Sequence, residues 1–516
     1  MAEYSSLFLQ LLVLILLLFL ALKFLKSLSS SGNIVCNGNS RRLDFIEKLF
    51  ECASTLNDGF GNISCVVSLS SKQSLLFKDV YDSLVLLVKR QPMLRCVIST
   101  KKDGEVYYDI KNIDDVIPLF DIKKSDDKIS DWKNLIYKYT STVHKNDLSW
   151  KAVILQQEYN TTTQVYTNMI MFAFKHSCID GISTVKFVEQ FINSLNEISD
   201  GISYDEKEIS SLKLLPSAHS LITQDKVGHT LFRFIANYFG VRPILTFLFE
   251  QMVLYKLKKK APNPFYQKYP PLSLDTVLPE SVERLEMKTF NEEETKMIVK
   301  ACKANGCTVT GAITAAIHLA FFQLLDEKDK KMLKIETQFA FNNRSYGNKK
   351  PEGEYLGLFL YYSLIDRMIH SQPDLHKFWT MAKENTAKLK QLVKNKTFIN
   401  EFTLMSSSGF DPNTQVNIIF NKENVWKSTS NTISSYGVFH IESSRGPSAI
   451  FQIENCYIHA LAHELDCLFR HHICTVNGKM TWMIRSDATI SDDHAQQMSH
   501  LCFNELSKNC CLVGKV

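Results

Sequence analysis

The 516-residue sequence lacks the short motifs that would assign it to several large enzyme classes. It has no glycine-rich phosphate-binding loop and no Gly-x-Ser-x-Gly turn, which argues against a kinase and against an α/β serine hydrolase. Basic residues do not form a long run interleaved with aromatic residues, and the net charge is only +5. A nucleic-acid partner is therefore not expected.

A disulfide framework is also missing. The chain has 13 cysteines, an odd number without regular spacing, which is typical of a protein in a reducing compartment. Apolar residues make up 45% and charged residues 22% of the sequence, the ordinary balance of a folded protein. The length suits two or three domains, and no internal repeat of fixed period is present.

The histidines do not form a recognisable metal motif. His459 and His463 lie four residues apart in "HALAHE", with Glu464 beside them, and His471 and His472 follow. This is not the His-Glu-x-x-His pattern, and a zinc site needs a third ligand within reach. We interpret these residues as ordinary surface or strand histidines and expect no metal.

What the sequence does contain begins with an uncharged apolar run at residues 4–22. Its length meets the requirement for a transmembrane helix, so residues 1–28 are predicted to be a membrane anchor. A cleavable signal peptide is the alternative, but the basic segment that normally precedes one is missing and the run is too long.

The charges around the run predict its orientation. Basic residues follow it at Lys23, Lys26, Arg41 and Arg42. Only Glu3 and the terminal amine precede it. By the positive-inside rule we expect a single-pass protein with its bulk in the cytosol. The membrane is expected to be that of the endoplasmic reticulum.

The rest of the chain divides into two α/β regions. Residues 29–40 are a small polar linker, and residues 41–215 alternate between predicted strands and helices. The apolar connector 216–279 breaks the pattern, and residues 280–516 form the second α/β region. Within the connector, residues 241–260 end in a lysine cluster, which fits either a buried helical hairpin or a helix lying in the membrane surface.

Three local patterns are strong. Residues 77–90 have the apolar spacing of a helix, and the apolar run 165–174 predicts a buried strand. Asn477-Gly478 lies between two apolar segments and predicts a tight hairpin.

The chemistry centres on "MFAFKHSCIDGIS", residues 171–183, where a predicted strand ends in His-x-x-x-Asp-Gly. Polar residues after a strand can simply mark a turn. A histidine held at the rigid end of a strand can also act as a general base near neutral pH, which makes His176 the candidate catalytic residue. An amphipathic helix is predicted to follow at residues 183–198.

Six segments in order resemble the condensation-domain and alcohol acetyltransferase superfamily, which is related to chloramphenicol acetyltransferase. They are "KRQPMLRCVI" (89–98), "KHSCIDGIS", "NGCTVTGAITAA", "FNNRSYGN", "LGLFLYYSLIDR" (356–367) and the final "HHICTVNGKMTWMIRSD". Together they extend from about residue 40 to residue 510. The second segment resembles the His-His-x-x-x-Asp-Gly active-site motif.

The resemblance implies a fold of two chloramphenicol-acetyltransferase-like α/β sandwich subdomains with an active-site tunnel between them. It implies an acyl-CoA-dependent O-acyltransferase with no bound cofactor, in which acyl-CoA is the co-substrate and an alcohol or amine is the acceptor. The predicted membrane segments favour a lipophilic acceptor or a fatty acyl donor, and the motif is equally compatible with acetyl transfer to a smaller alcohol. By the same resemblance, His176 is the general base and Asp180 forms a structural ion pair, with Arg344 as its candidate partner and Arg95 as a second candidate.

Three further residues are candidates for the site. Gly181 is expected to let the backbone turn sharply after the aspartate. By the same resemblance, Ser434 and Ser435 in "TISSYG" lie where the family brings a polar turn near the site, and they are candidate hydrogen-bond donors to an oxyanion.

Two departures from the family pattern stand out. Lys175 replaces the first histidine of the motif, and Arg367 falls one residue later than the family spacing. Lys175 favours an alternative hypothesis, a catalytically inactive, membrane-tethered lipid-binding or scaffold protein on the same fold. The presence of His176 together with Asp180-Gly181 favours an enzyme.

Overall fold

The computed structural model describes most of the chain between Asn39 and Leu512. The residues outside the described part are 1–38, 57–58, 60, 103, 204–207, 223–283 apart from six single positions (244, 247, 248, 251, 255 and 265), 326–332, 347–350, 352, 370–376, 408–411, 420–428, 442–445, 462–466, 487–489 and 513–516. The predicted anchor 1–28 lies outside the described residues, as do most of the linker 29–40 and most of the segment 241–260.

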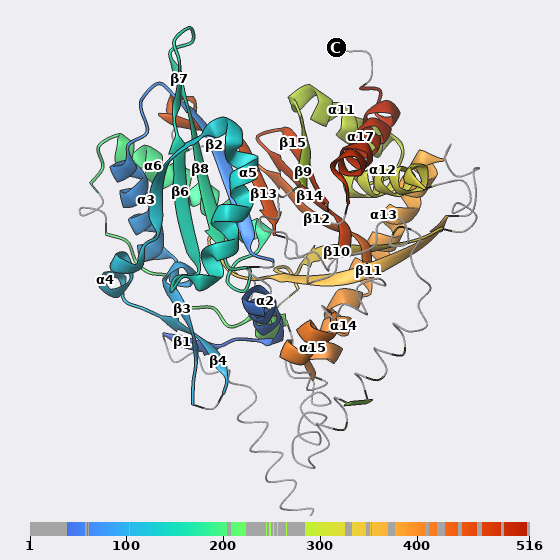
Figure 1. Ribbon diagram of the computed structural model, residues 1–516, viewed down its shortest axis with the longest axis horizontal. Coiled ribbons are helices and arrows are strands. Elements are labelled where there is room, and N and C mark those ends of the chain that lie inside the picture. The colour runs from blue at the N-terminus through green and yellow to red at the C-terminus, as the bar shows by residue number, and fades with distance from the viewer. Residues whose placement is uncertain are drawn as a thin grey trace, which may run out of the picture.

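The first half of the fold is built on a six-stranded, mostly antiparallel sheet (Figure 1). Its strand order is β13-β2-β8-β6-β5, and β7 pairs with β8 beside this path. The strands are β2 (Ile63–Ser71), β5 (Ile122–Lys128), β6 (Trp150–Gln156), β7 (Glu158–Asn160), β8 (Val165–Phe174) and β13 (Phe451–Ala460). Helices α3 (Phe77–Arg90) and α6 (Gly181–Ser199) cover one face, and α5 (Trp132–Thr140) covers the other.

Both faces of this sheet are buried, which explains the continuous apolar run in β8. Side chains alternate along a strand, so Phe172 and Phe174 pack with α3 and α6, whereas Met169 and Met171 lie on the α5 face. A strand that is covered on both faces has no solvent-exposed face that would require polar residues. The sequence pattern therefore loses its alternation.

The second half contains another six-stranded sheet, in the order β11-β10-β12-β14-β15-β9. Its strands are β9 (Arg284–Phe290), β10 (Leu333–Asn342), β11 (Leu360–Ile369), β12 (Thr429–Phe439), β14 (Cys467–Val476) and β15 (Lys479–Ser486). The helices on one face are α11 (Glu292–Ala304), α12 (Val309–Leu324), α13 (Phe378–Lys394) and α17 (Asp492–Asn509). They enclose the core of this half, in which α12 is buried along most of its length.

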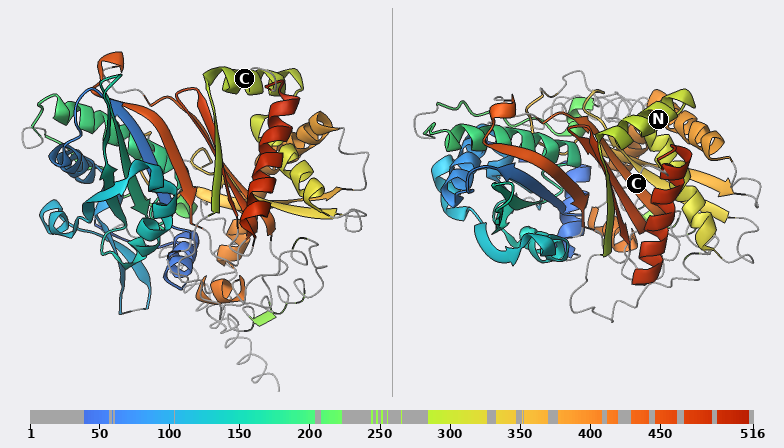
Figure 2. Two further views of the ribbon diagram at one scale, coloured as in Figure 1. Left: turned by 45° about the horizontal axis from the view of Figure 1, so that its top comes forward. Right: turned by 90° about the horizontal axis from the view of Figure 1, so that it is seen from above.

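Strand β13 joins the two halves. It comes late in the sequence, yet it pairs antiparallel with β2 along the edge of the first sheet. The strands before and after it, β12 and β14, pair with each other in the second sheet. The chain thus crosses between the halves twice, and Figure 2 shows the two sheets side by side with β13 on the facing edge. A domain boundary at residue 280 therefore does not fully separate the two sheets, because β13 follows residue 280 in the sequence but belongs to the first sheet.

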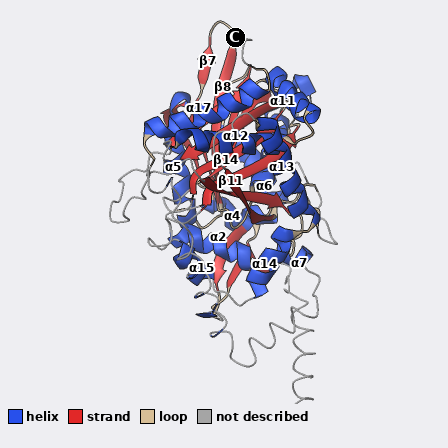
Figure 3. Ribbon diagram, turned by 90° about the vertical axis from the view of Figure 1, so that its right-hand side faces the viewer, coloured by secondary structure: helices blue, strands red, loops and turns tan. Residues whose placement is uncertain are grey.

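Helix α2 (Phe45–Leu56) forms a second link between the halves. Its Ile46 packs in one apolar cluster with Phe398 and Phe402 of α14 (Thr397–Ser407). Figure 3 shows α2, α14 and α15 together at the end of the molecule opposite α11 and α17. The remaining elements named in the figures are β1 (Ser40–Arg42), β3 (Cys96–Thr100), β4 (Val106–Ile110), α4 (Ile113–Val116), α7 (Ala218–Ile222) and α15 (Pro412–Ile419).

The strong sequence patterns are confirmed. The helix predicted at residues 77–90 is α3, and the strand predicted at 165–174 is β8. The final hairpin joins β14 to β15 through Asn477 and Gly478, whose φ angles of 48° and 80° are the positive values that such a turn requires.

Among the described residues, no single helix combines the length and the apolar composition of a membrane span. Helices α11 and α12 satisfy the criterion only as a pair bent by 93°.

The packing of β8 against α6 generates a test of the fold around the motif. The ring of Phe172 lies edge-on to Phe187 and Phe191 of α6, with centroids 5.0 and 5.1 Å apart, and it is fully buried. Phe172→Ala is expected to lower the free energy of unfolding by about 3–5 kcal/mol, measured by urea denaturation. Phe77→Ala, at a ring that is 42% exposed, is the control and should cost less than about 1 kcal/mol. Equal losses would contradict this packing.

Candidate active site

The His-x-x-x-Asp-Gly motif forms the connection between β8 and α6. Strand β8 lies inside the sheet, paired with β2 and β6, and ends at Phe174; α6 begins at Gly181. The six residues between them, 175–180, are all at least 95% buried. A loop this short between two packed elements holds its side chains in fixed positions.

His176 is held by its Nδ1 atom, which lies 2.8 Å from the carbonyl oxygen of Ile179. A carbonyl oxygen only accepts hydrogen bonds, so Nδ1 carries the hydrogen and Nε2 keeps its lone pair. Phe50 of α2 lies against the imidazole at a centroid distance of 4.1 Å. Burial disfavours the charged ring and lowers its pKa to about 4. His176 is therefore a neutral base at physiological pH.

Asp180 connects the two halves. Its Oδ1 atom accepts from Nη2 of Arg344 at 2.8 Å and from the backbone N–H of Ser183 at 2.7 Å. Its Oδ2 atom accepts from the backbone N–H of Phe359 at 2.8 Å. Burial on its own would raise the pKa of this carboxyl, but the Arg344 charge and the hydrogen bonds together hold it below its usual value.

Arg344 is itself well enclosed. Its guanidinium carbon lies 4.5 Å from the centre of the Phe359 ring, and its Nη1 donates to the side-chain oxygen of Asn342 at the end of β10. The expected ion pair between Asp180 and Arg344 is thus present, and both oxygens of Asp180 are engaged in structural contacts. The carboxylate also caps the N-terminus of α6 through Ser183.

The alcohol acetyltransferase profile matches residues 42–502 of this chain. The chain belongs to the alcohol acetyltransferase family. No curated sequence is similar enough to count as a relative.

Solved structures show the same fold at low sequence identity. The TRI3 trichothecene 15-O-acetyltransferase from Fusarium sporotrichioides superposes with a TM-score of 0.65 at 13% identity, covering 90% of this chain and 95% of that one. Polyketide synthase associated protein 5 from Mycobacterium tuberculosis gives 0.57 at 11%, covering 91% and 98%. The first condensation domain of the calcium-dependent antibiotic synthetase gives 0.54 at 12%, covering 92% and 96%. The mixed α/β architecture is therefore that of acetyltransferases and condensation domains.

Lys175, which replaces the first histidine of the family motif, is hydrogen-bonded to the segment 146–149. Its Nζ donates to the backbone oxygen of Asn146 at 3.1 Å, and its backbone N–H donates to Ser149. The side chain thus ties the motif to the segment before β6. Lys175 therefore has a structural contact here, and His176 keeps its own hydrogen bond to Ile179.

The expected role of Gly181 is wrong. Gly181 does not have a positive φ, so no sharp turn requires glycine there. It is needed for a different reason: a β-carbon at this position would lie 2.1 Å from the Tyr436 ring. The small residue lets an aromatic side chain from the other half lie directly on the start of α6.

Two other candidates have their partners away from Asp180 and His176. Arg95 donates to Ser211 at 2.6 Å, so the partner of Asp180 is Arg344. Ser435 is exposed and accepts a 3.4 Å hydrogen bond from Thr310 of α12. Ser434 lies beside His472 in the register of β12 and β14, on the face of β12 opposite to Ser435, and it stays a candidate for the site.

Two of the remaining sequence features have structural roles. Arg367 pairs with Glu384 of α13 at 3.0 Å, away from the motif. His459 is a buried strand residue of β13, whereas His463 lies outside the described residues. In the part of the chain that the structure describes, no three His, Cys, Asp or Glu side chains are grouped to hold a metal ion.

Sequence reasoning missed a set of residues that surround the motif. They are Phe50, Tyr362, Tyr436, Arg470 and His472. Arg470 and His472 are two apart on β14 and therefore share a face, a relationship that strand alternation could have indicated. Which face looks at His176 depends on the pairing of distant strands.

The ion pair at Asp180 generates a stability prediction for this acetyltransferase-family fold. Asp180→Ala leaves the buried Arg344 charge without its carboxylate and is expected to lower the free energy of unfolding by about 3–5 kcal/mol in urea denaturation. Removing both charges in Asp180→Ala with Arg344→Met should recover part of that loss. Asp366→Ala, in the exposed pair with Lys334, is the control and should cost about 1 kcal/mol or less. A loss at Asp180 no greater than in the control would contradict the buried pair.

Proposed function

We propose that this protein is a membrane-anchored acyltransferase that moves an acyl group from a CoA thioester to the hydroxyl, or amine, of a lipophilic acceptor. The observation that carries the proposal is the state of His176. Its Nδ1–H is committed to the Ile179 carbonyl, and burial keeps the ring neutral, so Nε2 is a free lone pair at the end of a rigid strand.

The chemistry needs little else from the protein. A thioester is already activated, but a hydroxyl is a poor nucleophile until its proton is removed. In the proposed mechanism Nε2 of His176 takes that proton as the acceptor oxygen attacks the thioester carbonyl. When the tetrahedral intermediate collapses, the proton passes to the departing thiolate. General-base catalysis of this kind contributes on the order of 10²- to 10⁴-fold.

The positioning of the two substrates supplies a second contribution to the rate. The motif loop belongs to the first half, and the backbone at Gly357 and Phe359, which contacts Asp180, belongs to the second. Two substrates meeting between the halves would be held by both, which converts a bimolecular encounter into a reaction within one complex. The expected tunnel between the halves is part of this proposal.

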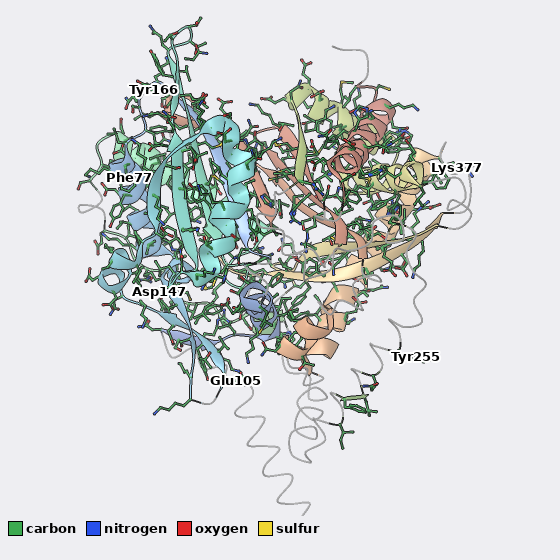
Figure 4. The ribbon with its side chains drawn as sticks, in the orientation of Figure 1. Phe77, Glu105, Asp147, Tyr166, Tyr255 and Lys377 are labelled. Carbon is green, nitrogen blue, oxygen red and sulfur yellow. The ribbon has the colours of Figure 1, made fainter. Side chains whose placement is uncertain are left out.

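The membrane part of the proposal rests on two segments. The first is the apolar run 4–22. The second is residues 241–260, where four described apolar side chains are each more than half exposed: Ile244, Phe247, Leu248 and Tyr255. Their spacing of three, four and seven residues places them on one helical face. Figure 4 shows Tyr255 away from the two sheets. Such a face supports contact with a lipid surface and favours the membrane-surface interpretation over a buried hairpin.

The alternative, an inactive binding protein, loses its main support at Lys175. The amine of Lys175 is bonded to Asn146 and does not occupy the place of the base. A site that retains the neutral His176, the capped α6 and the Asp180–Arg344 pair favours catalysis.

The test is CoA release from acetyl-, octanoyl- and palmitoyl-CoA by membranes that carry the protein, with mixed alcohols and amines present. His176→Ala is expected to reduce CoA release at least 100-fold because the base is removed. His500→Ala changes an exposed histidine of α17 and should leave the rate unchanged. Equal background rates for the wild type and His176→Ala across the panel would sink the proposal. The donor with the highest rate would give the acyl chain length.

The pH profile gives an independent check of the base. Catalysis needs neutral His176, so activity falls only as pH drops below its pKa of about 4. The acid limb of kcat/KM, which reports the free enzyme, is therefore expected well below pH 6.5, the usual value for histidine. Samples held at each pH and then assayed at pH 7.5 separate inactivation from titration. A reversible limb centred near pH 6.5 would contradict the assignment.

A further inference from the structure

Tyr436 occupies a bulge in β12. The pairing of β12 with β14 runs regularly through Ser434 and Ser435 and resumes at Gly437, which leaves Tyr436 as the extra residue. Gly437 has a φ of 108°, a value that side-chain-bearing residues rarely adopt. Bulges of this kind redirect a side chain and are common beside active sites. Here the bulge packs a partly buried tyrosine from the second half against the core of the first.

The Tyr436 ring lies against Gly181, the first residue of α6, directly after the loop that holds His176. A β-carbon added at Gly181 would lie 2.8 Å from Cζ of Tyr436, the carbon that bears the hydroxyl. The His176 ring is bonded to Ile179, two residues before Gly181. Both rings therefore contact one short, buried segment, with one ring contributed by each half of the protein.

His472 holds the hydroxyl. Its Nδ1 atom lies 2.8 Å from the Tyr436 oxygen, and the imidazole is 3% exposed. Its Nε2 atom is buried and has no hydrogen-bond partner among the described residues. A buried N–H without an acceptor is rarer in proteins than an acceptor without a donor, which favours the hydrogen on Nδ1. His472 then donates to the tyrosine oxygen, and the tyrosine hydrogen is free for another acceptor.

The charges around the pair suit this role. Burial raises the pKa of Tyr436 well above its usual value, so its hydroxyl stays protonated. Burial likewise lowers the pKa of His472, so the imidazole stays neutral. Arg470, two residues before His472, acts on both groups and on His176 through its positive charge.

We propose that the Tyr436 hydroxyl, oriented by His472, donates a hydrogen bond to the thioester carbonyl oxygen as that oxygen becomes an oxyanion. This inference rests on the proposed acyl transfer. As the acceptor oxygen attacks the carbonyl carbon, the C=O electron pair moves to oxygen and is stabilised by the tyrosine. It returns as the C–S bond breaks, and His176 gives its proton to the sulfur. Tyr436 remains intact and takes the role that the sequence assigned to Ser434 and Ser435.

Tyr436→Phe tests the hydroxyl directly. With the best acyl-CoA from the donor panel, kcat is expected to fall 10²- to 10³-fold, the range for loss of one oxyanion donor, while KM for the donor stays within about threefold. Binding of an S-alkyl-CoA thioether, which lacks the carbonyl, should be unchanged. Tyr166→Phe, at the far end of β8 (Figure 4), is the matched control and should keep the wild-type kcat. A kcat for Tyr436→Phe within threefold of the wild type would overturn the inference.

The second arm tests His472 and separates positioning from folding. His472→Phe removes the donor to Tyr436 and should lower kcat, whereas His472→Asn, whose amide lies near the Nδ1 position, should restore at least a tenth of the wild-type rate. Because both residues act through one hydroxyl, the double variant Tyr436→Phe with His472→Phe should have a kcat no lower than that of Tyr436→Phe alone. Two results would count against the pair. One is a double variant whose loss of kcat is the product of the two single losses, and the other is an equal loss of kcat in His472→Asn and His472→Phe.

The outcomes distinguish the two proposals. A wild type that releases no more CoA than His176→Ala refutes the acyl transfer and the inference together. An active wild type, an inactive His176→Ala and a fully active Tyr436→Phe refute only the inference.

Discussion

The carboxylate of Asp180 is the interaction on which the rest of the site depends. It is buried, and burial of a charge is tolerated only when the charge is paired and hydrogen-bonded. Its three donors come from α6, from Arg344 and from the chain leading into β11, so one side chain fixes the start of a helix in the first half and two segments of the second. A displacement of one half relative to the other would break the hydrogen bonds from Arg344 and Phe359 and leave the buried carboxylate without them. The pair therefore sets the separation of the halves at the point where the substrates are proposed to react.

The same constraint explains why a short loop can present a base accurately. Residues 175–180 are attached to a central strand at one end and to the capped helix at the other, and His176 hydrogen-bonds within the loop itself. The side chains of the loop therefore need little rearrangement during the reaction. Catalytic groups that are already oriented lower the barrier most effectively. Lys175 contributes on the outer side through Asn146. The bulge at Tyr436 adds a contact from the opposite half, and glycine at 181 makes room for it.

The sequence could predict the elements whose signal is local. Strand β8 was predictable because both of its faces are buried, α3 because of its apolar spacing, and the last hairpin because Asn477 and Gly478 accept positive φ. The motif and its resemblance led to His176, Asp180 and Arg344. The place of β13 was not predictable, since its partner β2 lies several hundred residues away and pairing over that distance leaves no local pattern. The bulge at Tyr436 was unpredictable for the same reason. Gly437 is visible in the sequence, but its φ angle depends on the pairing of β12 with β14, which comes later in the chain. Ser434 and Ser435 are in the same strand as Tyr436, two residues and one residue before it.

The late arrival of β13 has a consequence for synthesis of the chain. Strand β2 ends at Ser71, and its partner begins at Phe451, 380 residues later (451 minus 71). At ribosomal rates of about 5–20 residues per second, the edge of β2 waits roughly 20 to 80 s for its neighbour. During that time the nascent first half carries an open, apolar strand edge of the kind that invites pairing with other chains. The first half can therefore complete its sheet only after residues 451–460 have been synthesised.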